Sequence, residues 1–160
     1  MTAIVYCSNT GTAKRYAEAL AEKTGLPCLT PDEAAAAAPD DAVFLGWVLG
    51  GEVQGLKALR ETGLPLRAVG AVGIMAQEAD KVKEKNCAEG EAFFFLPGAF
   101  DVKKLKGLYK LMAGMISKAI KAKVKDDPGP ESEKILGFFE NGIDLFSEEA
   151  VQQMADFLNA

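Results

Sequence analysis

Five short apolar runs recur along the first hundred residues, and turn residues or a helical pattern follow each of them. They occupy residues 3–7, 28–30, 42–46, 68–74 and 92–96. Hydrophobic residues and glycine fill these runs almost without interruption, as in strands that helices cover on both faces. Because strands and helices alternate along the chain, the pattern predicts an α/β fold with a five-stranded parallel sheet.

The segments that follow these runs show helical spacing or are rich in glycine. Predicted helices occupy residues 13–23, 32–38, 53–61, 77–85 and 147–158. Ser147 is a suitable N-cap for the last of these helices. The third run ends in Trp47-Val48-Leu49-Gly50-Gly51, which we expect to be a glycine-rich loop that contains the chain's only tryptophan.

Residues 102–125 are predicted to form one long amphipathic helix with a basic face. Its apolar residues share one stripe, which comprises Leu105, Leu108, Tyr109, Met112, Met115, Ile116, Ala119 and Ile120. Residues 101–125 contain eight lysines and one aspartate. Because the lysines spread over several faces, a solvated surface that balances the acidic remainder is favoured. The alternative is a docking surface for an acidic partner or for an anionic membrane.

Composition limits the classes of function. The length of 160 residues is typical of one domain, which would span residues 1–160. The net charge of −5 argues against binding to nucleic acid, which usually requires a basic face. Histidine is absent, and this excludes a Ser-His-Asp triad, a Cys-His nucleophile pair and a histidine-ligated metal site.

The cysteines and the hydropathy pattern bear on the compartment. Cys7, Cys28 and Cys87 are too few and too scattered for a disulfide framework or a four-cysteine zinc site. They fit a reduced, cytoplasmic protein. We expect no signal peptide, because the N-terminus leads directly into a strand-like run. We also expect no spanning helix, because no stretch reaches about 18 uninterrupted apolar residues.

The sharpest local motif is Ser8-Asn9-Thr10-Gly11-Thr12-Ala13, between the first predicted strand and the first predicted helix. Backbone amides at a helix N-terminus donate hydrogen bonds to phosphate, and the helix dipole favours the negative charge. Three hydroxyls and one side-chain amide add further hydrogen-bonding groups, while Gly11 allows close approach of the backbone. The segment is neither a Walker P-loop nor a G-x-G-x-x-G fingerprint. The motif therefore predicts a phosphate-binding loop, and the alternative is a hydroxyl-rich turn that caps the helix.

This motif resembles the phosphate loop of flavodoxins, which bind flavin mononucleotide (FMN) and transfer electrons. The family pattern is roughly [ST]-x-T-G-x-[TA], and Ser8, Thr10, Gly11 and Ala13 match it. The segments Phe44 to Gly51 and Phe94 to Asp101 are similar to a flavodoxin-like subgroup that includes protoporphyrinogen oxidases. The resemblance extends over nearly the whole chain, but only the first loop is specific.

The resemblance implies a three-layer sandwich with the strand order 2-1-3-4-5 and a ligand at the carboxyl ends of the strands. The phosphate would lie in the loop of Ser8, Asn9, Thr10, Gly11, Thr12 and Ala13. The flavin ring would lie between two further loops. These comprise Gly46, Trp47, Val48, Leu49 and Gly50, and then Gly73, Ile74, Met75 and Ala76.

The sequence departs from many flavodoxins in the loop after the fourth strand, where Met75 replaces an aromatic residue that would stack on the ring. Stacking would then depend on Trp47, with Met75 as a sulfur contact. We expect an FMN-binding carrier that shuttles electrons between redox partner proteins, since no acid–base residue stands out near the predicted ring. The alternatives are a flavin-dependent oxidase or reductase acting on a small molecule, and an accessory module without flavin.

Overall fold

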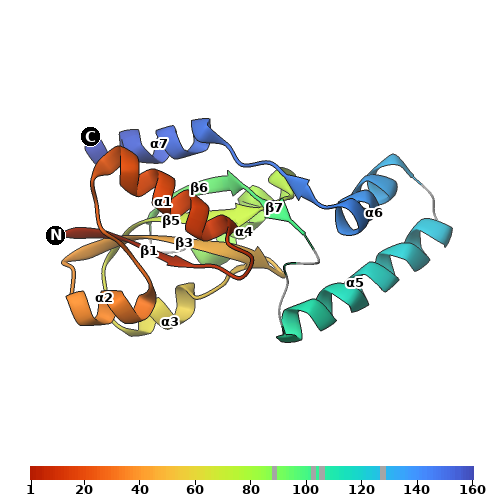
Figure 1. Cartoon of the computed structure of the whole chain (residues 1–160), viewed down its shortest axis with the longest axis horizontal. Coiled ribbons are helices and arrows are strands. Elements are labelled where there is room, and N and C mark those ends of the chain that lie inside the picture. The colour runs from red at the N-terminus through yellow and green to blue at the C-terminus, as the bar shows by residue number, and fades with distance from the viewer. Residues whose placement is uncertain (88–89, 102–103, 105–106, 127–128) are drawn as a thin grey trace. The chain divides into compact units, whose positions relative to one another are not determined.

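The computed structural model describes residues 1–87, 90–101, 104, 107–126 and 129–160. Within these residues the chain forms two compact units. Figure 1 colours the whole chain by residue number, so each unit is found by its residue range. Unit 1 contains residues 1–98 and 145–160, and unit 2 contains residues 99–144. Unit 2 is therefore an insertion between the last strand of the main sheet and the C-terminal helix. The expectation of one domain over residues 1–160 stays a prediction.

Unit 1 is built on a parallel sheet in the order β2-β1-β3-β5-β6. The strands are β1 (Thr2–Cys7), β2 (Cys28–Leu29), β3 (Asp41–Leu49), β5 (Leu66–Gly73) and β6 (Ala92–Pro97). Counted among the parallel strands alone, this order is 2-1-3-4-5, so the predicted α/β class and flavodoxin-like strand order are confirmed. A short strand, β4 (Glu52–Val53), pairs antiparallel with the end of β3.

Helices cover both faces of this sheet. One face packs against α1 (Thr12–Thr24) and α7 (Glu148–Asn159) around a core that includes Ile4, Leu45 and Leu96. The other face packs against α2 (Pro31–Ala37), α3 (Leu56–Glu61) and α4 (Ala79–Asn86), which follows the 3₁₀ turn η1 (Ala76–Glu78). Alternate residues of each strand enter the two cores, which is why the strand runs are apolar throughout.

Local signals explain where several of these helices begin and end. Thr30 and Glu33 form a reciprocal capping box before α2, and Ser147 accepts a hydrogen bond from the Ala150 N–H at 3.1 Å to cap α7. Helix α1 ends at Gly25, which is left-handed at φ 70°. The predicted cap at Ser147 is thus confirmed.

The buried Tyr16 joins three segments of unit 1. Its hydroxyl donates a hydrogen bond to the Pro97 carbonyl and accepts one from the Ser147 N–H at 2.9 Å. Its ring packs on Phe146 with centroids 4.4 Å apart. Tyr16 therefore links α1 both to the end of β6, before the chain leaves unit 1, and to the point where the chain returns.

Unit 2 begins and ends with a two-stranded antiparallel ladder between β7 (Ala99–Phe100) and β8 (Ile143–Asp144). Between them lie the helices α5 (Gly107–Asp126) and α6 (Pro130–Asn141), which pack together. Lys121 and Glu140 form an ion pair between the two helices at 3.5 Å. The sequence pattern did not indicate α6.

The predicted helix over 102–125 agrees with α5 only in part. Helix α5 begins at Gly107, and residues 102, 103, 105 and 106 lie outside the described residues. The described residues of the predicted apolar stripe differ in exposure, since Leu108 and Met115 are exposed while Met112 and Ile120 are half-buried. Among the helices of the described residues, none combines the length and hydropathy needed to cross a membrane.

Candidate functional site

All three predicted binding segments leave the same edge of the main sheet. Cys7 pairs with Gly46, and Gly46 pairs in turn with Ala71. The end of β1 is thus level with Gly46 and Ala71, and beyond this point β3 continues to Leu49 and β5 to Gly73. The order of strands reverses between β1 and β3, and this switch point is where open α/β sheets bind ligands.

The first segment, Ser8 to Gly11, connects β1 to α1. The Gly11 N–H donates a hydrogen bond to Ser8 Oγ at 3.0 Å, which closes a tight turn. Gly11 is the N-cap of α1 with φ 100°, a conformation that favours glycine. Within the described chain, no side chain caps α1 through a hydrogen bond. The predicted alternative, a hydroxyl cap on this helix, is therefore wrong, because Ser8 bonds to Gly11 itself.

Asn9 has a buried polar atom in this loop. Its Oδ1 is inaccessible to solvent and has no hydrogen-bond partner among the residues that the structure describes. A buried acceptor without a partner costs roughly 1–3 kcal/mol. A Cβ added at Gly11 would meet no described atom within 4 Å, so the space next to the turn is open. The loop thus combines an uncapped helix N-terminus, an unused acceptor and open space.

The second predicted segment is not a loop, and this corrects the sequence prediction. Strand β3 extends through Trp47, Val48 and Leu49, and β4 returns beside it, with Val48 opposite Val53. Gly50 and Gly51 form the turn, with φ 60° and 79°. Positive φ at both central residues is the condition for the type I′ turn of a two-residue hairpin, which two glycines meet without strain. The helix predicted from residue 53 accordingly begins only at Leu56.

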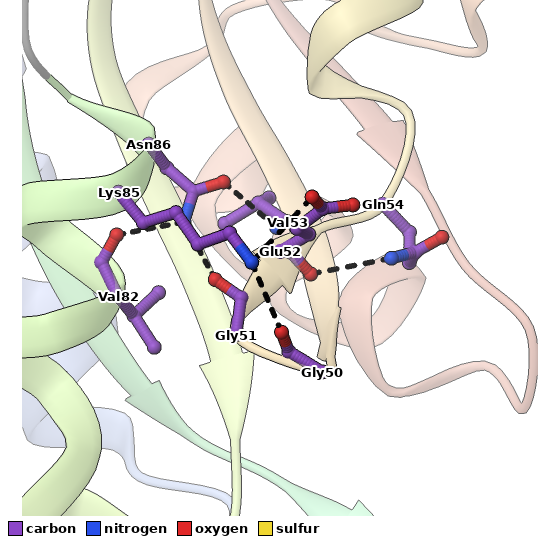
Figure 2. Close-up of polar contacts among 8 residues, drawn as sticks. All are labelled: Gly50, Gly51, Glu52, Val53, Gln54, Val82, Lys85 and Asn86. Carbon is purple, nitrogen blue, oxygen red and sulfur yellow. Dashed lines mark hydrogen bonds and ion pairs between the residues drawn. The ribbon is translucent and has the colours of Figure 1, made fainter.

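Asn86, at the end of α4, holds this hairpin in place (Figure 2). Its Oδ1 accepts from the Val53 N–H at 3.0 Å. Its Nδ2 donates to the Gly51 carbonyl at 2.8 Å and to the Val82 carbonyl at 2.7 Å. At 7% exposure it is the only buried polar residue in the described part of the chain. Sequence reasoning missed Asn86, because one asparagine in a polar helix shows no pattern.

Lys85 reaches the same hairpin from the solvent side (Figure 2). Its Nζ lies 3.3 Å from the Gly50 carbonyl and 3.5 Å from Glu52 Oε1. Both side chains of this ion pair are more than half exposed, so the pair contributes little to stability. Asn86 and Lys85 together bind the carbonyl oxygens of both turn glycines.

Gly46 is explained by the packing of the returning chain. A Cβ at this position would lie 2.6 Å from the Gln54 carbonyl oxygen and 2.7 Å from Val53 Cγ1. The Gln54 N–H also donates to the Trp47 carbonyl at 2.9 Å. Gly46 is therefore required by the close return of residues 53–54, whatever ligand binds nearby.

Trp47 lies within β3 and pairs with Val72 in the ladder. Its half-buried side chain packs against the core on the α1 and α7 face, whereas Val48 packs against the opposite core. The indole is thus partly a core residue, with its remaining surface at the carboxyl edge of the sheet. Its contact with a flavin ring stays a prediction.

The third predicted segment, Gly73 to Ala76, runs from the last residue of β5 to the first residue of η1. Added at Gly73, a Cβ would lie 3.1 Å from the Phe95 ring and 3.6 Å from Val48 Cγ2. The structure therefore brings Val48 and Gly73 close together. Met75 is half-buried, and the Gln77 amide lies 3.8 Å from its sulfur.

The pKa values of all three cysteine thiols are raised above their ordinary value. Burial raises the pKa of the Cys7 thiol, which directly precedes Ser8. Burial is also the main cause of the raised pKa values of Cys28 and Cys87, with Glu18 and Glu91 as secondary causes. All three cysteines are free thiols. Because a raised pKa lowers the thiolate fraction at neutral pH, these groups are poor nucleophiles.

No protein-family model matches the chain, and the search of curated proteins finds no match to it. The resemblance to flavodoxins therefore rests on the residues of the first loop and on the strand order of unit 1.

Proposed function

We propose that the protein binds FMN non-covalently and carries electrons between redox partner proteins. The observation on which this rests is the uncapped N-terminus of α1 at the switch point between β1 and β3. An uncapped helix N-terminus leaves several N–H groups without partners, and a phosphate satisfies them. When bound, the flavin would supply the electron-transfer chemistry.

The first loop has further groups that suit the phosphate and the sugar-like chain of FMN. Ser8 Oγ accepts from Gly11, so its own hydrogen is available to donate to a phosphate oxygen. Asn9 Oδ1 also has no described partner, but it is inaccessible to solvent, so a ligand hydroxyl would reach it only after a shift of the loop. Thr10 and Thr12 add hydroxyls on either side of Gly11. The open space at Gly11 would leave room for a ligand beside the turn.

The ring would lie against the carboxyl edge of the sheet, next to the β3–β4 hairpin and the segment Gly73 to Ala76. Trp47 and Met75 are the residues proposed to contact it. Asn86 fixes the position of the hairpin, and so acts as a positioning residue for this side of the site.

Unit 1 has sixteen acidic and nine basic residues. An acidic surface of this kind steers basic redox partners and keeps carriers apart from one another. A reducing compartment such as the cytoplasm would suit the three free thiols.

Visible absorbance of the purified protein, before and after incubation with FMN and desalting, is the direct test. Bands near ~370 and ~450 nm that persist after desalting are expected of a flavin protein. A titration with riboflavin then isolates the phosphate contribution. We expect FMN to bind at least about a hundredfold more tightly, since charge-assisted hydrogen bonds contribute about 1.5–3 kcal/mol each.

The possible outcomes separate the parts of the proposal. Equal affinity for riboflavin and FMN would contradict the assignment of the Ser8–Gly11 turn as a phosphate site. Protein that retains neither ligand would reject the cofactor, and the fold assignment would stand.

A further inference from the structure

Helix α5 presents large apolar side chains to solvent. Of the large hydrophobic residues that are exposed in the described chain, most lie on this one helix, at Leu108, Leu111, Met115 and Ile116. Leu108, Leu111 and Met115 are 68%, 64% and 65% exposed. Isolated exposed leucines are common, but several on one helix face indicate a surface that binds something.

These residues form a stripe along α5. Leu108, Leu111 and Met115 are three and four residues apart, and the exposed Ala119 and Ala122 continue the same spacing. We call these five residues the α5 stripe. The contact with α6 involves a different face, because the half-buried positions of α5 are Met112, Ser117, Ile120 and Val124. The α5 stripe is therefore not the face that packs in the α5–α6 pair.

Exposed lysines border the α5 stripe on both sides. At 100° per residue, Lys118 and Lys125 lie on one side and Lys123 lies on the other. No acidic residue occurs between Asp101 and Asp126, so the charged side chains of α5 are all lysines until its last residue, Asp126, which is exposed at the end of the α5 stripe. The described carboxylates of α6, at Glu133 and Glu140, are on the neighbouring helix, and Glu140 pairs with Lys121.

We infer that the α5 stripe docks on an anionic membrane surface, with α5 lying parallel to that surface. An apolar stripe bordered by lysines is the pattern of helices that lie at a membrane interface. The apolar side chains enter the boundary of the acyl chains, and the flexible lysine stems extend outward to the lipid headgroups. No described helix is suited to span the bilayer, so the contact is peripheral.

Charge decides against a second copy of the chain on the same face. Two α5 stripes that pack together would bring the bordering lysines of both copies next to each other, and like charges in contact are destabilising. An anionic bilayer instead supplies complementary charge along the whole helix, at roughly 1 kcal/mol of attraction per lysine near the surface. The inference does not depend on flavin binding, because the proposed flavin contacts lie in unit 1.

Co-sedimentation of the full chain with vesicles tests this inference. Vesicles of phosphatidylcholine with roughly 30% phosphatidylglycerol should bind the protein, and vesicles of phosphatidylcholine alone should not. Raising NaCl from about 50 to about 300 mM should weaken binding severalfold, because salt screens the exposed lysines. No binding to the anionic vesicles at low salt would overturn the inference.

Two variants separate the apolar and the basic contributions. Leu111→Glu with Met115→Glu should weaken vesicle binding at least about tenfold. Lys118→Gln with Lys123→Gln and Lys125→Gln should weaken it about a hundredfold. The matched control is Lys23→Gln with Lys57→Gln and Lys81→Gln, which removes the same charge from exposed positions of unit 1 and should change binding much less.

Circular dichroism checks that each variant is folded, and the elution volume in size-exclusion chromatography gives its oligomeric state. Equal losses in the control and in the α5 lysine variant would overturn the inference, since binding would then depend on total charge. A change in oligomeric state without a change in vesicle binding would assign the α5 stripe to a second copy. An unchanged vesicle affinity after both α5 variants would show that other residues make the contact.

Discussion

The β3–β4 hairpin and the Ser8–Gly11 turn leave the same edge of the sheet, but their polar groups are satisfied in different ways. In the hairpin, Asn86 and Lys85 bind the carbonyl oxygens of both turn glycines, and Asn86 also binds the Val53 N–H. In the turn, the hydrogen bond from the Gly11 N–H to Ser8 closes the loop, while Asn9 Oδ1 is buried without a described partner.

Under the proposed function, this difference separates a structural loop from a binding loop. Buried polar groups in folded proteins are nearly always paired. Asn9 Oδ1 is one of the buried side-chain atoms without a described partner, together with Asp41 Oδ1, Arg60 Nε and Glu91 Oε2, and it is the one that lies in the proposed phosphate loop. The polar groups of the hairpin are paired without a ligand, whereas under the proposed function the turn would gain partners from a phosphate. Substitutions in the hairpin should therefore reduce stability, and substitutions in the turn should reduce ligand affinity.

The largest effect on stability is expected for Gly46→Ala. The new Cβ would lie 2.6 Å from the Gln54 carbonyl oxygen, and this backbone atom cannot move without breaking the hairpin. We expect a loss of about 3 kcal/mol in the free energy of unfolding, measured by urea denaturation. Gly50→Ala is the control, because its Cβ would be free of described contacts and only its φ of 60° adds roughly 1 kcal/mol of strain. Equal losses in the two variants would show that the return of β4 is not tightly packed.

Asn86→Ala should have the next largest effect. It removes the partners of the Val53 N–H and the Gly51 carbonyl. We expect a loss of about 2 kcal/mol in unfolding free energy. Hydrogen exchange at the Val53 amide, followed by NMR, should become faster by a larger factor than at Val43, in the centre of β3. A variant as stable as the original protein, with unchanged exchange at Val53, would contradict the role assigned to Asn86.

Ser8→Ala and Ser147→Ala form a matched pair. Each serine accepts a hydrogen bond from the N–H three residues later, at 3.0 and 3.1 Å. Ser147→Ala should cost about 1 kcal/mol of stability and leave FMN affinity unchanged. Ser8→Ala should weaken FMN binding about tenfold, because a hydrogen bond to a charged phosphate is lost. Fluorescence titration measures the FMN affinity of each variant. If both substitutions change FMN affinity equally, the phosphate does not bind at Ser8.

Lys85→Ala should have the smallest effect. Its ion pair with Glu52 is exposed to solvent, and such pairs contribute about 0.2–1 kcal/mol. We expect a loss of no more than about 0.5 kcal/mol, and less in high salt. A loss of stability comparable to that of Asn86→Ala would contradict this prediction. It would mean that the solvent-exposed contacts of Lys85 stabilise the hairpin as much as the buried hydrogen bonds of Asn86.

Local patterns in the sequence determined the sheet and the first loop. Helices cover both faces of the sheet, so its strands are apolar at nearly every position. A continuous apolar run in the sequence therefore indicates a buried strand. The turn after β1 was also predictable, since the turn residues Ser8 to Gly11 stand between a strand-like run and a helical pattern. In contrast, the glycine-rich segment after residue 46 was predicted as a loop, because a two-glycine hairpin differs from a loop only when its partner strand is known.

Only the tertiary structure decided which polar groups are paired and which apolar faces are covered. Asn86 bonds to Gly51, 35 residues away, and Tyr16 bonds to the Ser147 N–H, 131 residues away. Neither contact leaves a mark in the local pattern. The apolar residues of α5 likewise divide between a face that packs with α6 and the exposed α5 stripe, although helical spacing alone placed them together. Periodicity gives the direction of a side chain on its own helix, whereas a partner segment decides whether that side chain is buried.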